Sequence, residues 1–210
     1  MIGTSELRRR QARPSLTAAH LRAIERALFA LAIVLLGWYG LQQLATAYDQ
    51  AIASRELETI RLPVNAPTPL RRDVLPIGSL VGRIEIPRVG LSAIVREGDD
   101  TATLRRAVGH IPETALPGDR GNAGLAGHRD TFFRGLKNVH VGDRVVLTTT
   151  NAVLHYVVRS TRVVEPTDVS VLNSTPRPTL TLVTCYPFYY LGAAPKRYIV
   201  QAEQAADAQQ

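Results

Sequence analysis

The 210-residue chain contains a single cysteine, Cys185, and this scarcity excludes several common roles for the residue. One thiol cannot form an intramolecular disulfide, and the same count excludes a C-x-x-C zinc or redox site. The five histidines have no spacing typical of a metal cluster: His20, His110, His128, His140 and His155. We therefore expect no cofactor and no bound metal.

The chain also lacks an evenly distributed basic charge, although its formal net charge is +7. Residues 1–26 contain six arginines against Glu6 and Glu25, a net charge of +4, and the rest of the chain is close to balanced. Basic charge concentrated beside an apolar stretch is typical of membrane topology rather than of a phosphate-binding surface. We expect a membrane partner and no nucleic acid.

The apolar stretch at 27–47 contains no charged residue and is long enough, as a helix, to cross a hydrocarbon core of about 30 Å. The preceding arginines predict that residues 1–26 form a cytoplasmic tail and that everything after Ala47 lies outside the cytoplasm. A cleavable signal peptide is the alternative, because Ala45-Thr46-Ala47 matches an A-x-A site. The long leader before the apolar stretch favours an uncleaved single-pass anchor in the cell membrane.

Residues 48–77 form a mixed polar tract with four prolines, which favours an extracytoplasmic stalk: Pro63, Pro67, Pro69 and Pro76. Residues 51–62 are expected to prolong the membrane helix. A structured segment wrapped over the following domain remains the alternative.

Residues 78–203 have the pattern of an all-β domain, followed by a C-terminal tail at 204–210. Alternating apolar and polar positions predict eight short strands, at 80–86, 91–95, 123–128, 144–149, 152–161, 163–165, 180–184 and 197–202. Short helices are expected over 102–108 and 132–136. With no βαβ rhythm, the pattern predicts a closed or nearly closed eight-stranded β-barrel.

Cys185 lies at the end of the strand predicted at 180–184. Pro187 cannot continue a strand ladder, so this strand should stop at or just past Cys185. A thiol at a strand end is exposed enough to react and fixed enough to be aimed. A buried, inert cysteine is the alternative interpretation.

The ends of two other predicted strands contain side chains that could assist this thiol, His128 and Arg197. Antiparallel neighbours joined by a loop bring the end of one strand beside the start of the next, so Cys185 and Arg197 should lie side by side. His128 ends an earlier strand, and its imidazole can favour the thiolate and protonate a leaving amine. The Arg197 guanidinium can donate hydrogen bonds to an oxyanion. Considered alone, His128 could instead be a structural histidine, and Arg197 could instead be a solvent-exposed charge.

Three segments resemble the sortases, membrane-anchored cysteine transpeptidases of the bacterial surface, and most closely their class D: LAGHRDTFFRGL (125–136), TLTLVTCYPF (179–188) and AAPKRYIVQA (193–202). The resemblance covers about residues 78–203 and implies a sortase-type barrel. It also implies that His128 is the catalytic histidine, Cys185 the nucleophile and Arg197 the catalytic arginine. Arg129 and Arg134 are rival arginines without the strand context of Arg197.

The resemblance further implies cleavage of a C-terminal LPXTG-like sorting signal, carried by secreted proteins, between threonine and glycine. A thioester on Cys185 would then be resolved by an amine of a peptidoglycan precursor or of a protein lysine. The alternatives are a Cys-His thiol protease without transfer and a non-catalytic anchored β-domain. Glu97, Asp99 and Asp100 raise the possibility of a calcium site but lack a binding-loop signature, so we expect them to be surface acids.

Overall fold

The computed structural model describes residues 18–59, 75–190 and 192–205, so most of the predicted cytoplasmic tail, Pro63, Pro67 and Pro69 of the predicted stalk and most of the C-terminal tail lie outside the described residues. The chain divides into two compact units, Met1–Ala45 and Thr46–Gln210. Helix α1 (Ala18–Thr59) contains the apolar stretch and is long and apolar enough to cross a membrane. Its apolar side chains in the first unit, such as Ile33 and Leu36, are exposed.

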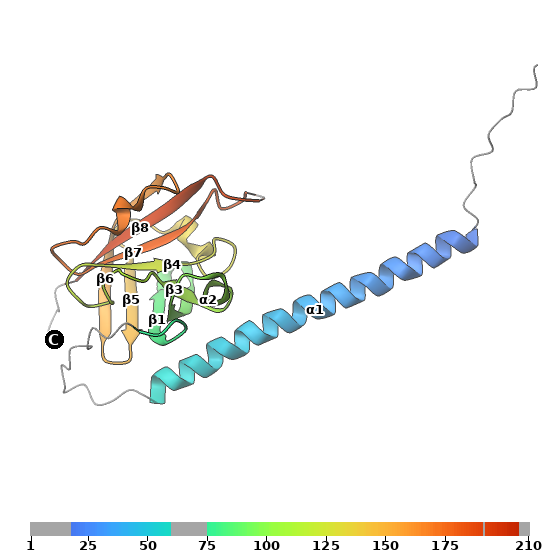
Figure 1. Ribbon diagram of the computed structural model, residues 1–210, viewed down its shortest axis with the longest axis horizontal. Coiled ribbons are helices and arrows are strands. Elements are labelled where there is room, and N and C mark those ends of the chain that lie inside the picture. The colour runs from blue at the N-terminus through green and yellow to red at the C-terminus, as the bar shows by residue number, and fades with distance from the viewer. Residues whose placement is uncertain (1–17, 60–74, 191, 206–210) are drawn as a thin grey trace, which may run out of the picture. The chain divides into compact units, whose positions relative to one another are not determined.

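Within the described residues of the second unit, eight strands form a closed barrel in the order β1-β2-β3-β4-β7-β8-β6-β5 (Figure 1). The β2–β3 and β4–β7 pairs are parallel, and the other neighbouring pairs are antiparallel. The predicted eight-stranded barrel is thereby confirmed. The strands are β1 (Leu80–Ile86), β2 (Leu91–Glu97), β3 (Val108–His110), β4 (Asn122–Ala126), β5 (Arg144–Thr149), β6 (Val153–Val164), β7 (Thr179–Tyr186) and β8 (Lys196–Gln204).

Short helices join several of these strands. They are η1 (Pro87–Val89), α2 (Thr101–Arg106), η2 (Arg134–Asn138) and η3 (Val169–Leu172). Asp100 caps α2, because its carboxylate accepts hydrogen bonds from the Ala102 and Thr103 amides. Asp100 is also exposed, in agreement with the expectation that it is a surface acid.

The membership of the eight strands differs from the prediction in two places. The strand predicted at 163–165 is not a separate strand, because β6 continues to Val164. The pairing of β6 with β8 shifts register between Val158 and Ser160. The missing strand is β3, only three residues long, whose first residue was assigned to the preceding helix. A three-residue segment is too short to show a two-residue period, so its pairing with β2 and β4 defines it.

The barrel interior is filled by one side of each strand. Ile84, Leu125, Leu147 and Leu182 are fully buried there and belong to one apolar cluster. Tyr156 is also buried, and its hydroxyl accepts a hydrogen bond from the Gly118 amide at 3.0 Å. Burial raises the pKa of Tyr156 to about 12, so this residue stays neutral and structural.

The last turns of α1 pack on the barrel within the second unit. The Gln50 carboxamide donates to the Arg106 carbonyl at 2.6 Å and accepts from the Ile94 amide at 2.9 Å. Ala53 is fully buried beside Ile94. The side chain of Gln50 thus provides hydrogen-bond partners for a carbonyl in the last turn of α2 and for a backbone amide of β2. Gln50 and Ala53 belong to the predicted stalk at 48–77. Their contacts with the barrel favour a structured segment over an extended spacer for this part of the stalk.

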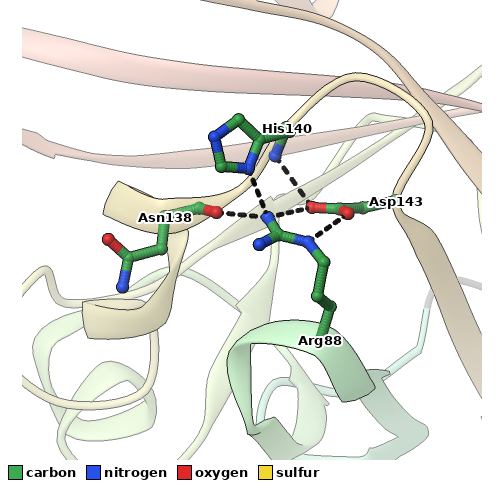
Figure 2. Close-up of polar contacts among 4 residues, drawn as sticks. All are labelled: Arg88, Asn138, His140 and Asp143. Atoms are coloured by element: carbon green, nitrogen blue, oxygen red, sulfur yellow. Dashed lines mark hydrogen bonds and ion pairs between the residues drawn. The ribbon is translucent and has the colours of Figure 1, made fainter.

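A polar cluster joins η1 to the segment before β5 (Figure 2). The Arg88 guanidinium donates to both oxygens of the Asp143 carboxylate, to the Asn138 carbonyl and to His140 Nδ1, the last at 2.7 Å. Asp143 is buried, and it also accepts from the His140 amide at 2.8 Å. Since each group satisfies another, the cluster fixes the chain between η2 and β5.

The Asp143 carboxylate should make the free energy of unfolding depend on pH in the acid range. The hydrogen bond from Arg88 holds the pKa of Asp143 below its ordinary value of 3.8, against the opposing effect of burial. A carboxylate with a lowered folded-state pKa stabilises the fold above its unfolded pKa, and this contribution is lost as the pH falls through the folded pKa. We expect Asp143→Asn to lower the free energy of unfolding by about 1–3 kcal/mol at pH 7. The deficit should shrink below about pH 4 in chemical unfolding measured across pH. Asp99→Asn, at an exposed carboxylate, is the control; an equal deficit there would contradict the role given to Asp143.

Candidate active site

Cys185 lies on β7 and Arg197 on its neighbour β8, while His128 follows the end of β4, the neighbour of β7 on the other side. Leu182 of β7, Leu125 of β4 and Val200 of β8 point into the core, so residues an odd number of positions away point outward. Cys185 and Arg197 therefore belong to the outer face, and His128 follows β4 in the same phase. All three are half-buried.

Strand register places these residues in one row. Cys185 pairs directly with Arg197 across the antiparallel β7–β8 ladder, as predicted from the strand ends. In the parallel β4–β7 ladder Ala126 pairs with Val183, and His128 and Cys185 each follow two residues later. Since residues opposite one another in a sheet share a face, the order across the rim is His128, Cys185, Arg197.

Hydrogen bonds continue the alignment past the end of β4. The Gly127 amide donates to the Val183 carbonyl at 3.1 Å, and the buried Thr184 hydroxyl donates to the Gly127 carbonyl at 2.7 Å. Gly127 cannot carry a side chain, because a Cβ there would lie 2.7 Å from the ring of Phe133, which is fully buried. The Phe133 amide in turn donates to the His128 carbonyl at 3.0 Å. The backbone at His128 is therefore held from both sides.

Three aromatic residues near Cys185 and Arg197 in the chain contact one another. Tyr186 stacks on Tyr198 with ring centroids 6.2 Å apart, and Phe188 meets Tyr198 edge-on at 5.4 Å. Phe188 and Tyr198 pack against the core. Because Tyr186 and Tyr198 directly follow Cys185 and Arg197 in the chain, this packing braces the backbone of both residues.

The Arg197 guanidinium is oriented by the loop between β7 and β8. Its Nη1 donates to the carbonyls of Ala194 at 3.3 Å and Lys196 at 3.1 Å. Nε and Nη2 have no protein acceptor within the described part of the chain. A planar guanidinium held through one nitrogen keeps the others available to an external acceptor.

The connection from β6 to β7 covers the outer face farther from the rim. Asn122 donates to the Val171 carbonyl of η3 at 2.9 Å and accepts from the Thr181 hydroxyl at 2.7 Å, all within a buried layer. Gly124 lies under Leu172, since a Cβ would approach that side chain to 2.9 Å. On β4 and β7, the exposed part of the outer face is thus confined to the end that contains Cys185.

The sequence analysis did not predict a buried pair formed by Glu97, the last residue of β2, and His110, the last residue of β3. His110 Nδ1 lies 2.7 Å from the Glu97 carboxylate, and Nε2 lies 2.9 Å from the Ala115 carbonyl. The expectation that Glu97 is a surface acid was therefore wrong, since the residue is 5% exposed. The signal was present in the alternation: Glu97 shares a strand face with Val95, which is fully buried.

Arg129 was considered only as a rival catalytic arginine, and its observed role is different. Its Nη2 donates to the carbonyls of Tyr190 at 2.6 Å and Gly192 at 3.1 Å. Arg129 therefore holds the loop between β7 and β8 against the segment that follows His128. No local sequence signal predicts this contact, because its partners are backbone carbonyls about sixty positions away.

Comparison with known proteins gives consistent matches over the barrel. Residues 84–205 match the sortase domain family model. The chain is 35% identical over 128 residues to sortase D of Bacillus subtilis, which covers 60% of this chain and 65% of that protein. The chain thus spans slightly less than two thirds of the length of this relative.

Two solved structures extend the likeness to three dimensions. A sortase D5 transpeptidase of Clostridium perfringens has a TM-score of 0.61 at 28% identity, covering 74% of this chain and 99% of that one. Sortase E1 of Streptomyces coelicolor, solved with a tripeptide in the active site, has a TM-score of 0.56 at 30% identity and covers 61% of this chain and 90% of that one. The family model covers more than half of the chain and coincides with the barrel that contains the row of His128, Cys185 and Arg197. The chain belongs to the sortase family.

Proposed function

We propose that this chain is a membrane-associated cysteine transpeptidase that cleaves an LPXTG-like C-terminal sorting signal between threonine and glycine. The observation that carries the proposal is the row of His128, Cys185 and Arg197 fixed by strand register at the open end of the outer face. A half-exposed thiol supports reaction over the alternative of an inert, buried cysteine. Family membership supplies the reaction class.

The first half of the reaction forms a thioester. The Cys185 thiolate attacks the threonine carbonyl carbon, and the electron pair of the C=O bond moves to the oxygen, where the free donors of Arg197 stabilise it. When the tetrahedral intermediate collapses, the carbon–nitrogen bond breaks. His128 gives its proton to the departing glycine amine, so the leaving group is neutral.

The second half returns the enzyme to its starting state. An amine attacks the thioester carbon and loses one proton to the neutral His128 imidazole; the carbon–sulfur bond breaks, and sulfur leaves with the electron pair as the Cys185 thiolate. The donor substrates are proposed to be secreted proteins that carry the sorting signal, and the acceptor an amine of a peptidoglycan precursor or of a protein lysine. The tripeptide in the Streptomyces coelicolor sortase E1 structure supports peptide binding at the corresponding site.

We also propose that α1 is retained as a membrane anchor with its N-terminus in the cytoplasm and the barrel outside. The apolar helix supports the anchor, and the arginines before it support the orientation. An extracytoplasmic barrel would meet secreted proteins and cell-wall amines on the side where both occur.

Transfer and hydrolysis can be distinguished with the full chain in detergent. Incubation with an LPXTG-like peptide should yield a product ending at threonine joined to an added amine, identified by its mass. The amine-linked product should grow with amine concentration at the expense of the free acid. Formation of the free acid alone at every amine concentration would instead support the thiol protease alternative.

A further inference from the structure

A pocket is lined by residues that follow His128 and Cys185 in the chain. It has a volume of about 410 Å³, and two loops form it: the segment after His128 and the segment after Cys185. Both loops begin at the C-terminal ends of the parallel strands β4 and β7, whereas η3 covers the other end of these strands. The pocket and the covered face therefore lie on opposite sides of the thiol. Its lining residues are Arg129, Asp130, Arg134, Lys137, Phe188, Tyr189 and Tyr190.

The pocket has an excess of positive charge. Arg129, Arg134 and Lys137 line it against the single carboxylate of Asp130. The Lys137 ammonium donates to the Tyr189 hydroxyl, and this bond, with the nearby charges of Lys137 and Arg134, holds the pKa of Tyr189 below its ordinary value. A phenol whose anion is favoured in this way reports a positive local potential.

One cation in the pocket wall has unused hydrogen-bonding capacity. Arg129 holds the loop between β7 and β8 through Nη2, while its Nη1 is buried without a hydrogen-bond partner. A buried donor without an acceptor is uncommon and costs free energy. The charge of Arg129 therefore adds to those of Arg134 and Lys137 in the pocket wall, and it is not neutralised by an acceptor at Nη1.

We propose that this pocket receives the acceptor and selects an amine that carries a carboxylate on a neighbouring carbon, as in an amino acid. The inference rests on the proposed function and specifies its acceptor. A simple alkylammonium would be repelled by the three cations, whereas a carboxylate gives the same molecule a favourable contact with Arg134 and Lys137. The positive potential also favours the neutral form of the amine, which is the nucleophile.

The chemical step remains a balanced acyl transfer. The amine nitrogen uses its lone pair to form a bond to the thioester carbon, and the carbon–sulfur bond breaks with its electron pair on the Cys185 sulfur. The nitrogen loses one proton to the His128 imidazole. The carboxylate takes no part in bond changes and serves only to hold the amine beside the thioester.

Competition between glycine and glycinamide tests the proposal, because these two amines differ in the carboxylate. The full chain in detergent is given an LPXTG-like peptide with both amines, and the two ligated products are quantified by mass. Comparing their ratio between enzymes cancels the intrinsic reactivity of the amines and any change in thioester formation. We expect the glycine-to-glycinamide ratio to fall about tenfold in the double variant Arg134→Gln, Lys137→Gln.

The matched control removes two exposed positive charges elsewhere, in Arg105→Gln, Arg144→Gln, and should keep the wild-type ratio. An unchanged ratio in the pocket variant, or an equal fall in the control, would overturn the carboxylate selection while leaving the transpeptidase intact. Hydrolysis of the thioester with neither amine incorporated would also overturn the acceptor pocket. If no thioester forms in the wild-type protein, the proposed function fails first and this inference with it.

Discussion

Replacing Cys185 with alanine is expected to abolish both cleavage of an LPXTG-like peptide and formation of the covalent intermediate. The chain contains no second thiol, so no other residue can provide the same nucleophile. An alanine methyl group cannot form the thioester through which both halves of the reaction pass. The expected loss is therefore complete within the sensitivity of a mass-based assay for peptide products.

The fold of the Cys185→Ala variant should remain intact. Cys185 is half-buried on the outer face and lies outside the apolar cluster of the barrel interior. Its free energy of unfolding should therefore change by less than about 1 kcal/mol, measured by denaturant titration. A variant that kept this stability and still cleaved the peptide would remove Cys185 from the mechanism.

Arg197→Ala should lower peptide turnover roughly 100- to 1000-fold, which corresponds to about 2.7–4 kcal/mol in the barrier. A peptide carbonyl is a poor electrophile, and its oxyanion must be stabilised as it forms. Arg197 lies directly opposite Cys185 in the ladder and is held through Nη1, which keeps its other donors available. Steady-state kinetics should show the loss mainly in kcat/KM.

Lysine should restore only part of this activity, because it keeps the charge but loses the planar fork of donors. Alkylation of Cys185 by a small thiol reagent should be much less affected, since that reaction forms no oxyanion. The control is Arg105→Ala, an exposed arginine on α2. Wild-type turnover by Arg197→Ala, or an equally large loss in the control, would reject Arg197 as the third catalytic residue even if Cys185 passes its own test. Arg129 does not serve as a control, because it holds the loop between β7 and β8.

The pairing of Cys185 with Arg197 could be predicted from sequence, because it depends on two strands that are consecutive in the chain. Pro187 limits β7, and the short connection to β8 makes the two strands antiparallel neighbours, so the pairing of Cys185 with Arg197 follows from local rules. The place of His128 is harder to predict, because β4 and β7 are parallel and 60 positions (186 − 126) separate their last residues. For this residue the family resemblance supplied what strand patterns did not.

Contacts between distant segments escaped the sequence analysis. Strand β3 is defined by its neighbours rather than by its own pattern, and Glu97 is buried because His110 satisfies it. The guanidinium of Arg129 reaches carbonyls of a loop that no periodicity relates to it. In each case the partner in space, rather than the residue type, determines the structure.

The central claim is that Cys185 carries the acyl group during the reaction. The most direct measurement is the intact mass of the full chain, quenched in acid soon after mixing with an LPXTG-like peptide and without added amine. The account predicts a mass increase equal to the peptide acyl group ending at threonine, located at Cys185 by fragmentation and released by hydroxylamine. A peptide that is cleaved while the protein mass stays unchanged, or an acyl group on any other residue, would contradict it.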